Sequence, residues 1–226
     1  TRTLNSYFGC ETQIKKYVLD YPGVYLSKEI SKWYYGTVEE AQAAGWLTTK
    51  QARQKYSTEE EFYSALMDIT QFSRVAAEQH SYTAGVWQLF EDKIDNFLNI
   101  FNQEDLLRSY LLHVLEFFIK NGYSRVELRA PLFPIKRRNP AEMLYEKDVV
   151  KIYEEVEQEL QKKYPYFTIG LIVFGLKIFN PEQLEKYFRM AYSIESHLII
   201  GIDMVQEEDI HPEFDTYEPT IRKIQQ

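Results

Sequence analysis

Residues 168–174 read TIGLIVF, an almost unbroken run of apolar side chains. A short run of this kind is typical of a strand that is buried on both faces of a parallel sheet. Two further strand-like segments flank it along the chain. They lie at 124–132, where apolar and charged residues alternate, and at 198–205. The three segments together predict a parallel sheet.

Helices are predicted between these strands. Residues 147–164 carry apolar residues at helical spacing and end at Pro165. Asn180 is expected to cap a helix that has Pro181 at its first position and runs to about residue 196. Strand, helix, strand, helix, strand is the order of an α/β protein whose parallel sheet is covered by helices.

The N-terminal half has a different pattern. Helical periodicity predicts three helices, at 59–78, 85–101 and 103–120. Before them, the sequence predicts a strand at 3–8, a helix at 11–19 and an irregular insert with short helical pieces at 21–57. We expect one domain over 1–226, made of a helical segment (58–122), a βαβαβ segment (123–205) and an acidic, loosely patterned tail (206–226).

The net charge of −8 argues against general nucleic-acid binding, which needs clustered Lys and Arg to neutralise phosphates. The dense basic run is Lys136-Arg137-Arg138, which we interpret as solvated loop cations in preference to a phosphate site. Apolar runs are far shorter than the ~20 residues that a membrane span requires, so we expect none.

Cys10 is the only cysteine, which excludes an intrachain disulfide and a zinc site built on several thiolates. A single cysteine favours a reducing compartment. The chain also has 18 Tyr and 14 Phe. This content fits either an interaction surface rich in tyrosine or a bulky core with tyrosines at its rim, and both interpretations stay open.

Three stretches resemble the adenosine deaminase family, most closely its extracellular, growth-factor-like branch. They are VWQLFE at 86–91, RVELRAPL at 125–132 and GIDMVQEED at 201–209. Their order and spacing fit as well, so the resemblance covers nearly the whole chain. It implies a (β/α)8 barrel with its site at the carboxyl ends of the strands, and a zinc-activated water that attacks C6 of adenosine. It also implies a secreted relative, in contrast to the cysteine content.

The chain departs from this family at the residues that carry the chemistry. The family's Leu-His-x-His, which supplies two zinc ligands, aligns with Leu4-Asn5-Ser6-Tyr7. An amide is a poor zinc ligand and a phenol has a pKa of about 10, so neither Asn5 nor Tyr7 replaces an imidazole. Gln206 stands where the family has a glycine that lets the backbone approach the purine, three residues after Asp203. The family's later His-Ala-Gly-Glu, a further His and an Asp pair would lie beyond Gln226.

Other chemistry has weak support. The histidines His80, His113, His197 and His211 are not at metal-ligand spacing; we expect His113 to be half-buried and His197 to end a helix. Acidic clusters occur at 59–61, 154–155 and 207–209, and only the third follows a strand at the functional edge. For all of these residues, and for Cys10, ordinary structural roles are favoured.

The sequence therefore predicts a partial (β/α) barrel of the TIM type with a helical insert, without zinc. We expect a non-catalytic subunit that binds other protein chains and no nucleoside. The alternatives are part of a zinc-dependent adenosine deaminase whose other site residues lie outside this chain, and a nucleoside-binding sensor. At least one of Glu127 and Arg129, which lie on a half-buried strand, is expected to have a structural ion-pair or hydrogen-bond partner. A partly open barrel also predicts that the chain is not a free-standing monomer, unless the insert covers the open side.

Overall fold

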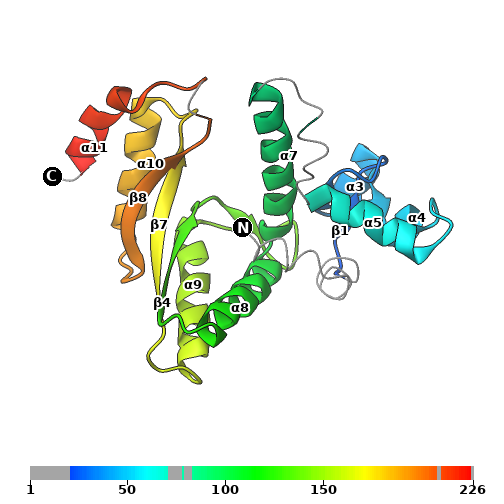
Figure 1. Cartoon of the computed structure of the whole chain (residues 1–226), viewed down its shortest axis with the longest axis horizontal. Helices are drawn as coiled ribbons and strands as arrows, with labels where there is room; N and C mark the ends of the chain where they lie inside the picture. Colours follow the sequence, from blue (N-terminus) through cyan, green and yellow to red (C-terminus); the bar gives the residue numbers. More distant parts are fainter. Residues whose placement is uncertain (1–20, 71–77, 79–82, 208–209, 225–226) are drawn as a thin grey trace. The chain divides into compact units, whose positions relative to one another are not determined.

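The computed structural model describes residues 21–70, 78, 83–207 and 210–224. The strand predicted at 3–8 and the helix predicted at 11–19 lie outside these residues. Contacts divide the chain into two compact units. Figure 1 labels the helices and strands that they contain. The first unit is Thr1–Tyr110 with Ile135–Met143, and the second unit is Leu111–Pro134 with Leu144–Gln226.

A small antiparallel sheet lies in the first unit, where the sequence predicted only an irregular insert. Its strands are β1 (Val24–Leu26), β2 (Trp33–Tyr35) and β3 (Leu47–Thr48), in the order β2-β1-β3. The short helices α3 (Val38–Ala44) and α4 (Thr49–Arg53) each begin with a capping box. Strands of two or three residues are too short to show the alternation that identifies a strand, so the sequence of this segment has the pattern of an irregular insert.

Aromatic side chains hold this small sheet together. Trp33 and Tyr35 are buried, with 1% and 6% of their surfaces exposed. The ring of Tyr34 stacks on that of Trp46, with centroids 4.2 Å apart and planes 3° from parallel. In this part of the chain the aromatic residues form a core, so the aromatic content does not by itself indicate an interaction surface.

The three helices expected between residues 59 and 120 are present. They are α5 (Glu59–Thr70), α7 (Thr83–Phe101) and α8 (Glu104–Lys120), and the division between the two units runs through α8. The side chain of Thr58 accepts from the N–H of Glu61 at 3.2 Å, and the Glu61 carboxylate accepts from the N–H of Ser57 at 3.0 Å. The acidic cluster at 59–61 therefore serves, in part, to cap α5.

The second unit contains the predicted parallel sheet. Its elements are β4 (Arg125–Ala130), α9 (Glu146–Gln161), β7 (Thr168–Leu176), α10 (Pro181–Ser193) and β8 (Ile199–Val205). The strands pair in parallel in the order β4-β7-β8, as Figure 1 shows. The predicted α/β class is confirmed, and so is the cap of α10, where Asn180 accepts from the N–H of Gln183 at 2.9 Å. A barrel stays a prediction, because the described strands form a small sheet.

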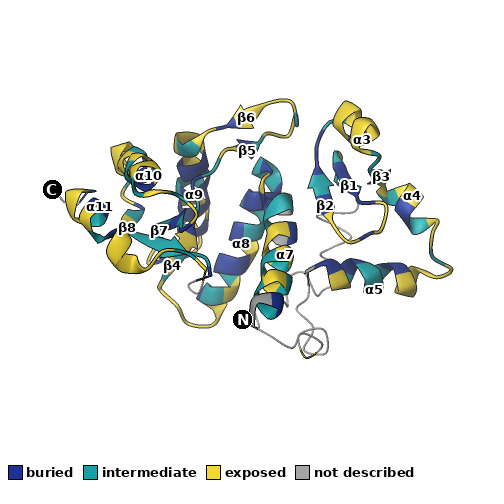
Figure 2. Ribbon diagram, turned by 90° about the horizontal axis from the view of Figure 1, so that it is seen from above, coloured by how far each residue is buried: buried dark blue, intermediate teal, exposed yellow. Residues whose placement is uncertain are grey.

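One face of this sheet is covered by helices. Ile169, Leu171 and Val173 of β7 are at most 2% exposed, and α9 and α10 both contact β7. Figure 2 shows these two helices on the same side of the sheet. On the opposite face, Ile172 and Phe174 are partly exposed. The sequence predicted burial of β7 on both faces, and in the described part of the chain only one face is fully covered.

The C-terminal tail contains two elements that the sequence did not predict. They are the 3-10 helix η2 (Phe214–Thr216) and the helix α11 (Glu218–Ile224). Between them, Tyr217 is 1% exposed and packs with Leu184 of α10. Its hydroxyl donates to the carbonyl of Lys177 at 2.6 Å, which fastens the tail to the end of β7. A helix of only two turns is too short to show a periodic pattern in the sequence.

Two glycines of β7 are expected to respond differently to alanine. A Cβ on Gly175 would lie 2.5 Å from Leu184 Cδ1 and 3.2 Å from Phe188 Cζ, and both of those side chains are fully buried. A Cβ on Gly170 would meet the end of Ile200, which is 42% exposed and free to rotate away. We expect Gly175→Ala to lower the free energy of unfolding by about 1–3 kcal/mol, and Gly170→Ala by less than about 1 kcal/mol. Urea denaturation of both variants tests this, and equal losses would contradict it.

Candidate functional site

The carboxyl edge of the parallel sheet is the candidate site. Because β4, β7 and β8 are parallel, they all end at this edge, at Ala130, Leu176 and Val205. Ligands of α/β sheets and barrels usually bind at this edge, beyond the strand ends. Asp203 and Gln206, the two pocket positions predicted from the sequence, both lie here.

Arg129 on β4 forms an ion pair with Asp203 on β8, across the intervening β7. The other carboxylate oxygen of Asp203 accepts from the N–H of Met204 at 2.7 Å. Glu127 pairs with Arg125 of its own strand, with 3.2 Å between Oε1 and Nε. About half of the Arg129 side chain, 55%, is exposed, so this pair contributes at most about 1 kcal/mol. Glu127 and Arg129 thus each have an ionic partner, and their structural role stays a prediction.

Gln206 follows β8 directly and has a backbone φ of +131°. Glycine adopts this region readily and other residues rarely do. The Gln206 side chain accepts from the N–H of Ile178 at 2.8 Å, which joins the end of β8 to the loop after β7. This is the position at which the resemblance places a glycine. The backbone here therefore has a glycine-type conformation, although the residue carries a side chain.

This conformation predicts a reversed preference between glycine and alanine. At the exposed position Gln158 on α9, glycine should be less stable than alanine by about 1 kcal/mol, as in helices generally. At Gln206 both substitutions remove the same hydrogen bond, but only glycine relieves the backbone strain. We expect Gln206→Gly to be more stable than Gln206→Ala by about 1 kcal/mol. Urea denaturation of the four variants measures both differences, and the same order at the two positions would contradict the prediction.

Tyr187 of α10 supports the loop that follows β4. Its hydroxyl oxygen accepts from the N–H of Leu132 at 2.8 Å, and its ring lies 5.9 Å from the rings of Phe133 and Phe179. Burial raises the pKa of Tyr187 to about 12, although the Leu132 N–H acts in the opposite direction. The hydroxyl is therefore protonated at neutral pH, so a neutral group holds this loop.

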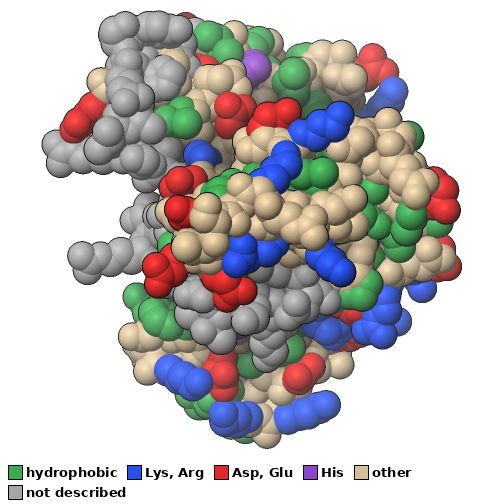
Figure 3. Space-filling model, turned by 90° about the vertical axis from the view of Figure 1, so that its right-hand side faces the viewer, with side chains coloured by type: hydrophobic (Ala, Val, Ile, Leu, Met, Phe, Trp, Pro, Cys, Tyr) green, Lys and Arg blue, Asp and Glu red, His purple; other side chains and the backbone are tan. Residues whose placement is uncertain are grey.

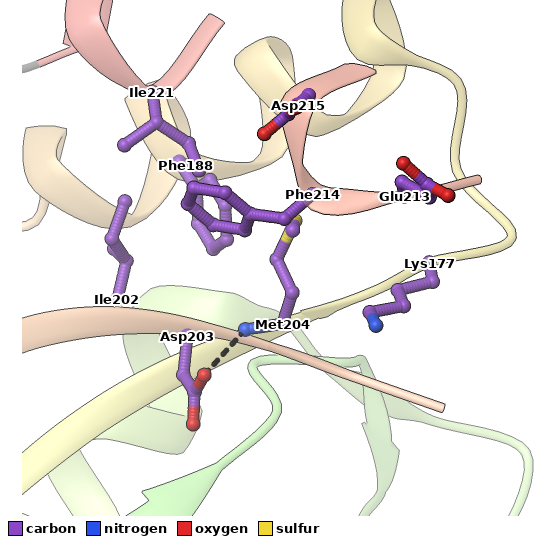
Figure 4. Close-up of a pocket in the computed structure, with 9 residues that line it drawn as sticks. All are labelled: Lys177, Phe188, Ile202, Asp203, Met204, Glu213, Phe214, Asp215 and Ile221. Carbon is purple, nitrogen blue, oxygen red and sulfur yellow. Dashed lines mark hydrogen bonds between the residues drawn. The ribbon is translucent and has the colours of Figure 1, made fainter. Parts of the chain in front are cut away.

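A cavity of about 590 Å³ lies beside the same edge, between β8, α10 and the segment η2–α11. Figure 4 shows its lining, which comprises Lys177, Phe188, Ile202, Asp203, Met204, Glu213, Phe214, Asp215 and Ile221. The carboxylate of Asp203 points away from the apolar side chains, toward the other face of the sheet. Sequence reasoning missed this cavity, because the pattern of the tail gave no sign that Phe214 and Ile221 face β8.

We expect no zinc ion at this edge of the sheet, because of the chemistry of two residues in the sequence. Asn5 and Tyr7 lie outside the described residues, but their amide and phenol groups are poor substitutes for two imidazoles. Within the part of the chain that the structure describes, no three His, Cys, Asp or Glu side chains form a group that could hold a metal ion. That the chain binds no zinc remains a prediction.

Two predictions about the histidines were wrong. His113 is exposed on α8 and not half-buried. His197 lies in the loop after α10 and not at the helix end; its Nε2 is 2.7 Å from a carboxylate oxygen of Glu157. Folding brings Glu157 to this loop from α9, a contact that no local pattern indicates. His211 is partly exposed, and His80 lies outside the described residues.

The acidic clusters belong to separate elements. Glu154 on α9 accepts from the hydroxyl of Ser196 at 2.6 Å, and Glu207 after β8 is 7% exposed. Residues 208–209 and Cys10 lie outside the described residues. Of the acidic cluster at 207–209, which follows β8 at the carboxyl edge of the sheet, the structure therefore describes Glu207 alone.

The basic run is largely paired with acids. Lys136 Nζ lies 2.9 Å from Glu40 Oε2, and Arg138 Nε lies 2.7 Å from Asp105 Oδ2, while Arg137 is exposed. Positive and negative side chains are interspersed over the face shown in Figure 3. This pairing agrees with loop cations, and the expected lack of a nucleic-acid partner stays a prediction. None of the described helices is both long enough and apolar enough to cross a membrane.

Comparisons with known proteins give a distant match. No protein-family model matches the chain. Adenosine deaminase 2 of Sus scrofa is 23% identical over 179 residues, which cover 76% of this chain. A zinc-bound cog1816 amidohydrolase from Burkholderia ambifaria superposes on 54% of this chain and 32% of its own, with 13% sequence identity. The TM-score of 0.44 is too low to support an argument about this chain.

The match to adenosine deaminase 2 covers 35% of that protein, so the chain spans about a third of its length. The chain is thus a distant relative of adenosine deaminase 2.

Proposed function

We propose that this chain is a non-catalytic, adenosine-deaminase-like protein that serves as a structural or interaction subunit of a larger assembly. The observation that carries the proposal is the pair Asn5 and Tyr7, at positions where the resemblance places two zinc-binding histidines. Zinc, when bound in the family, activates the water that displaces ammonia from adenosine. An amide and a neutral phenol leave this chain without that pair of ligands.

Gln206 gives further support to a non-catalytic role. The resemblance places a glycine here, so that the backbone can approach the purine closely. In this chain a side chain occupies the position, on a backbone with a φ of +131°, and hydrogen-bonds to the N–H of Ile178. A purine would have to displace this side chain, so we expect no nucleoside ligand at the carboxyl edge.

We also propose that the sheet β4-β7-β8 is a section of a (β/α) barrel of the TIM type, with 21–57 as an insert. Its support is the parallel order with one helix between successive strands, and a second sheet face that carries the partly exposed Ile172 and Phe174. Strands β4 and β8 are edges of the described sheet. Edges and apolar faces of this kind are usually covered, which favours association with further protein.

Zinc content and deamination test the proposal. We expect the purified chain to contain far less than one zinc per molecule by elemental analysis, and to release no ammonia from adenosine. The double variant Asn5→His/Tyr7→His, which carries imidazoles at both positions, is the control for zinc content. Stoichiometric zinc in the unmodified chain, together with turnover of adenosine, would overturn the non-catalytic role. Gel filtration with light-scattering detection of the purified chain tests the interaction role. A chain that elutes as a compact monomer, and still does so after incubation with its native extract, would count against that role.

The similarity to adenosine deaminase 2 also favours a second candidate, a part of a zinc-dependent adenosine deaminase whose remaining site residues lie outside this chain. In that case the native assembly would bind zinc and deaminate adenosine, while the isolated chain would do neither. Titration calorimetry of the isolated chain with adenosine distinguishes these two candidates from a nucleoside-binding sensor. A sensor would bind adenosine without turning it over.

A further inference from the structure

The cavity beside α10 has apolar side chains on its inner wall and two exposed acidic side chains at its rim. Phe188 and Met204 line it from α10 and β8, and Ile221 closes it from α11. Glu213 and Asp215 are exposed and stand on the η2 side, as Figure 4 shows. No ion pair with a described residue neutralises either carboxylate. The charge that a ligand meets on the η2 side is therefore negative.

Two large apolar side chains in this part of the chain are exposed. Phe214 is 55% exposed and Ile178 is 64% exposed. The segment that carries Phe214 is well anchored, because the Tyr217 N–H donates to its carbonyl at 2.8 Å and the buried Tyr217 hydroxyl bonds to the carbonyl of Lys177 at 2.6 Å. The fold therefore holds an aromatic ring at the surface, next to an open apolar space. Aromatic side chains are enriched in the interfaces between proteins.

We propose that this cavity receives one large apolar side chain from a segment of another protein, and that Lys or Arg residues next to that side chain in the segment meet Glu213 and Asp215. The inference rests on the proposed interaction role and names a surface for it. A volume of about 590 Å³ is ample for one aromatic side chain. Central apolar anchors surrounded by complementary charge are how small interfaces gain affinity and specificity. Lys177 also lines the cavity, but only 6% of its surface is exposed, so the exposed Glu213 and Asp215 are the charged side chains that a partner reaches first.

Short capped peptides test the chemistry without knowledge of the partner. The probe is Ac-Lys-Phe-Lys-NH2, titrated into the full chain and followed through the methyl signals of Met204 and Ile221. We expect saturable shifts in the millimolar range, with Ile119 on α8 as an unaffected reference. Ac-Glu-Phe-Glu-NH2 should bind at least about fivefold more weakly, and Ac-Lys-Ala-Lys-NH2 should give no saturable shift.

Charge reversal at the rim provides the matched variants. Glu213→Lys/Asp215→Lys should weaken binding of the Lys-Phe-Lys probe about tenfold and reverse the preference toward Glu-Phe-Glu. The control, Glu159→Lys/Glu195→Lys, makes the same change of charge at exposed acids of the second unit that do not line the cavity. Its affinity for the probe should match that of the unmodified chain. Circular dichroism verifies that each double variant is folded.

Three outcomes would overturn the inference. No saturable shift for any probe would show that the cavity does not accept a side chain. Equal affinity for the basic and acidic probes, or an unchanged affinity after rim reversal, would identify a site for an uncharged apolar ligand instead. Failure here leaves the proposed function intact, because a partner can bind elsewhere. Conversely, a zinc-loaded chain that deaminates adenosine would end the non-catalytic proposal without changing the probe titrations.

Discussion

Phe188→Ala is expected to lower the free energy of unfolding by about 3–5 kcal/mol. The side chain is fully buried and packs with Leu184 and Tyr217 in the core cluster that joins α10 to the tail. Its removal loses the burial of an aromatic ring and enlarges the adjacent cavity. Urea denaturation followed by far-UV circular dichroism measures the loss. Trp33, Trp46 and Trp87 all belong to the first unit, so their fluorescence follows that unit separately.

Phe214→Ala is the matched control for this prediction. It removes the same side chain from the rim of the same cavity, but Phe214 is 55% exposed. We expect a loss below about 1 kcal/mol, because little apolar area returns to water. If Phe188→Ala lowered the free energy of unfolding no more than Phe214→Ala does, the described packing of α10 against the tail would be contradicted.

Glu157→Ala is expected to lower the free energy of unfolding by about 2–4 kcal/mol. Glu157 is 3% exposed on α9, and its carboxylate accepts from the N–H of Ile169 at 2.7 Å and contacts His197 Nε2 at 2.7 Å. Alanine leaves the buried N–H of Ile169 without its acceptor, which costs about 1–3 kcal/mol, and also removes buried packing. The loss should be visible in the circular-dichroism transition.

Two variants separate the contributions at this carboxylate. Glu157→Gln keeps an oxygen that can accept from Ile169, so we expect a loss of only about 1 kcal/mol. His197→Ala removes a side chain that is 65% exposed and should cost less than about 1 kcal/mol. Glutamine as harmful as alanine would mean that the negative charge, and not the acceptor for Ile169, stabilises the unit.

The sequence predicted the second unit well because each of its elements has a strong local signal. The run at 168–174 became β7, and Asn180 with Pro181 fixed the start of α10. These signals are local in origin, since they depend on apolar spacing and on the caps of single helices. The parallel order then follows from the alternation of strands and helices.

The missed features depend on contacts between segments that are far apart in the sequence. The sheet β1–β3 has strands of two or three residues, and its stability comes from packing such as Tyr34 on Trp46. The cavity forms because Tyr217 ties the tail to the end of β7. No periodic pattern in 206–226 indicates that contact. Likewise, the partner of His197 comes from a different helix.

The candidate site was predicted in part. Gln206 and Asp203 were identified through the family resemblance, and both lie at the carboxyl edge of the sheet. The ion pair from Arg129 to Asp203 spans three strands, so the sequence could predict that Arg129 needs a partner but not which one.

The parallel pairing of β4 with β7 also affects how the second unit folds. Arg125 pairs with Thr168, and the whole of α9 lies between them in the chain. Closing so long a connection loses chain entropy before the first ladder hydrogen bond is formed, so folding is slow compared with a helical protein of the same size. Until the sheet has formed, the apolar residues of β7 are exposed to water, which favours aggregation. Refolding yield should therefore fall as protein concentration rises, and a chaperone that shields exposed strands should restore it.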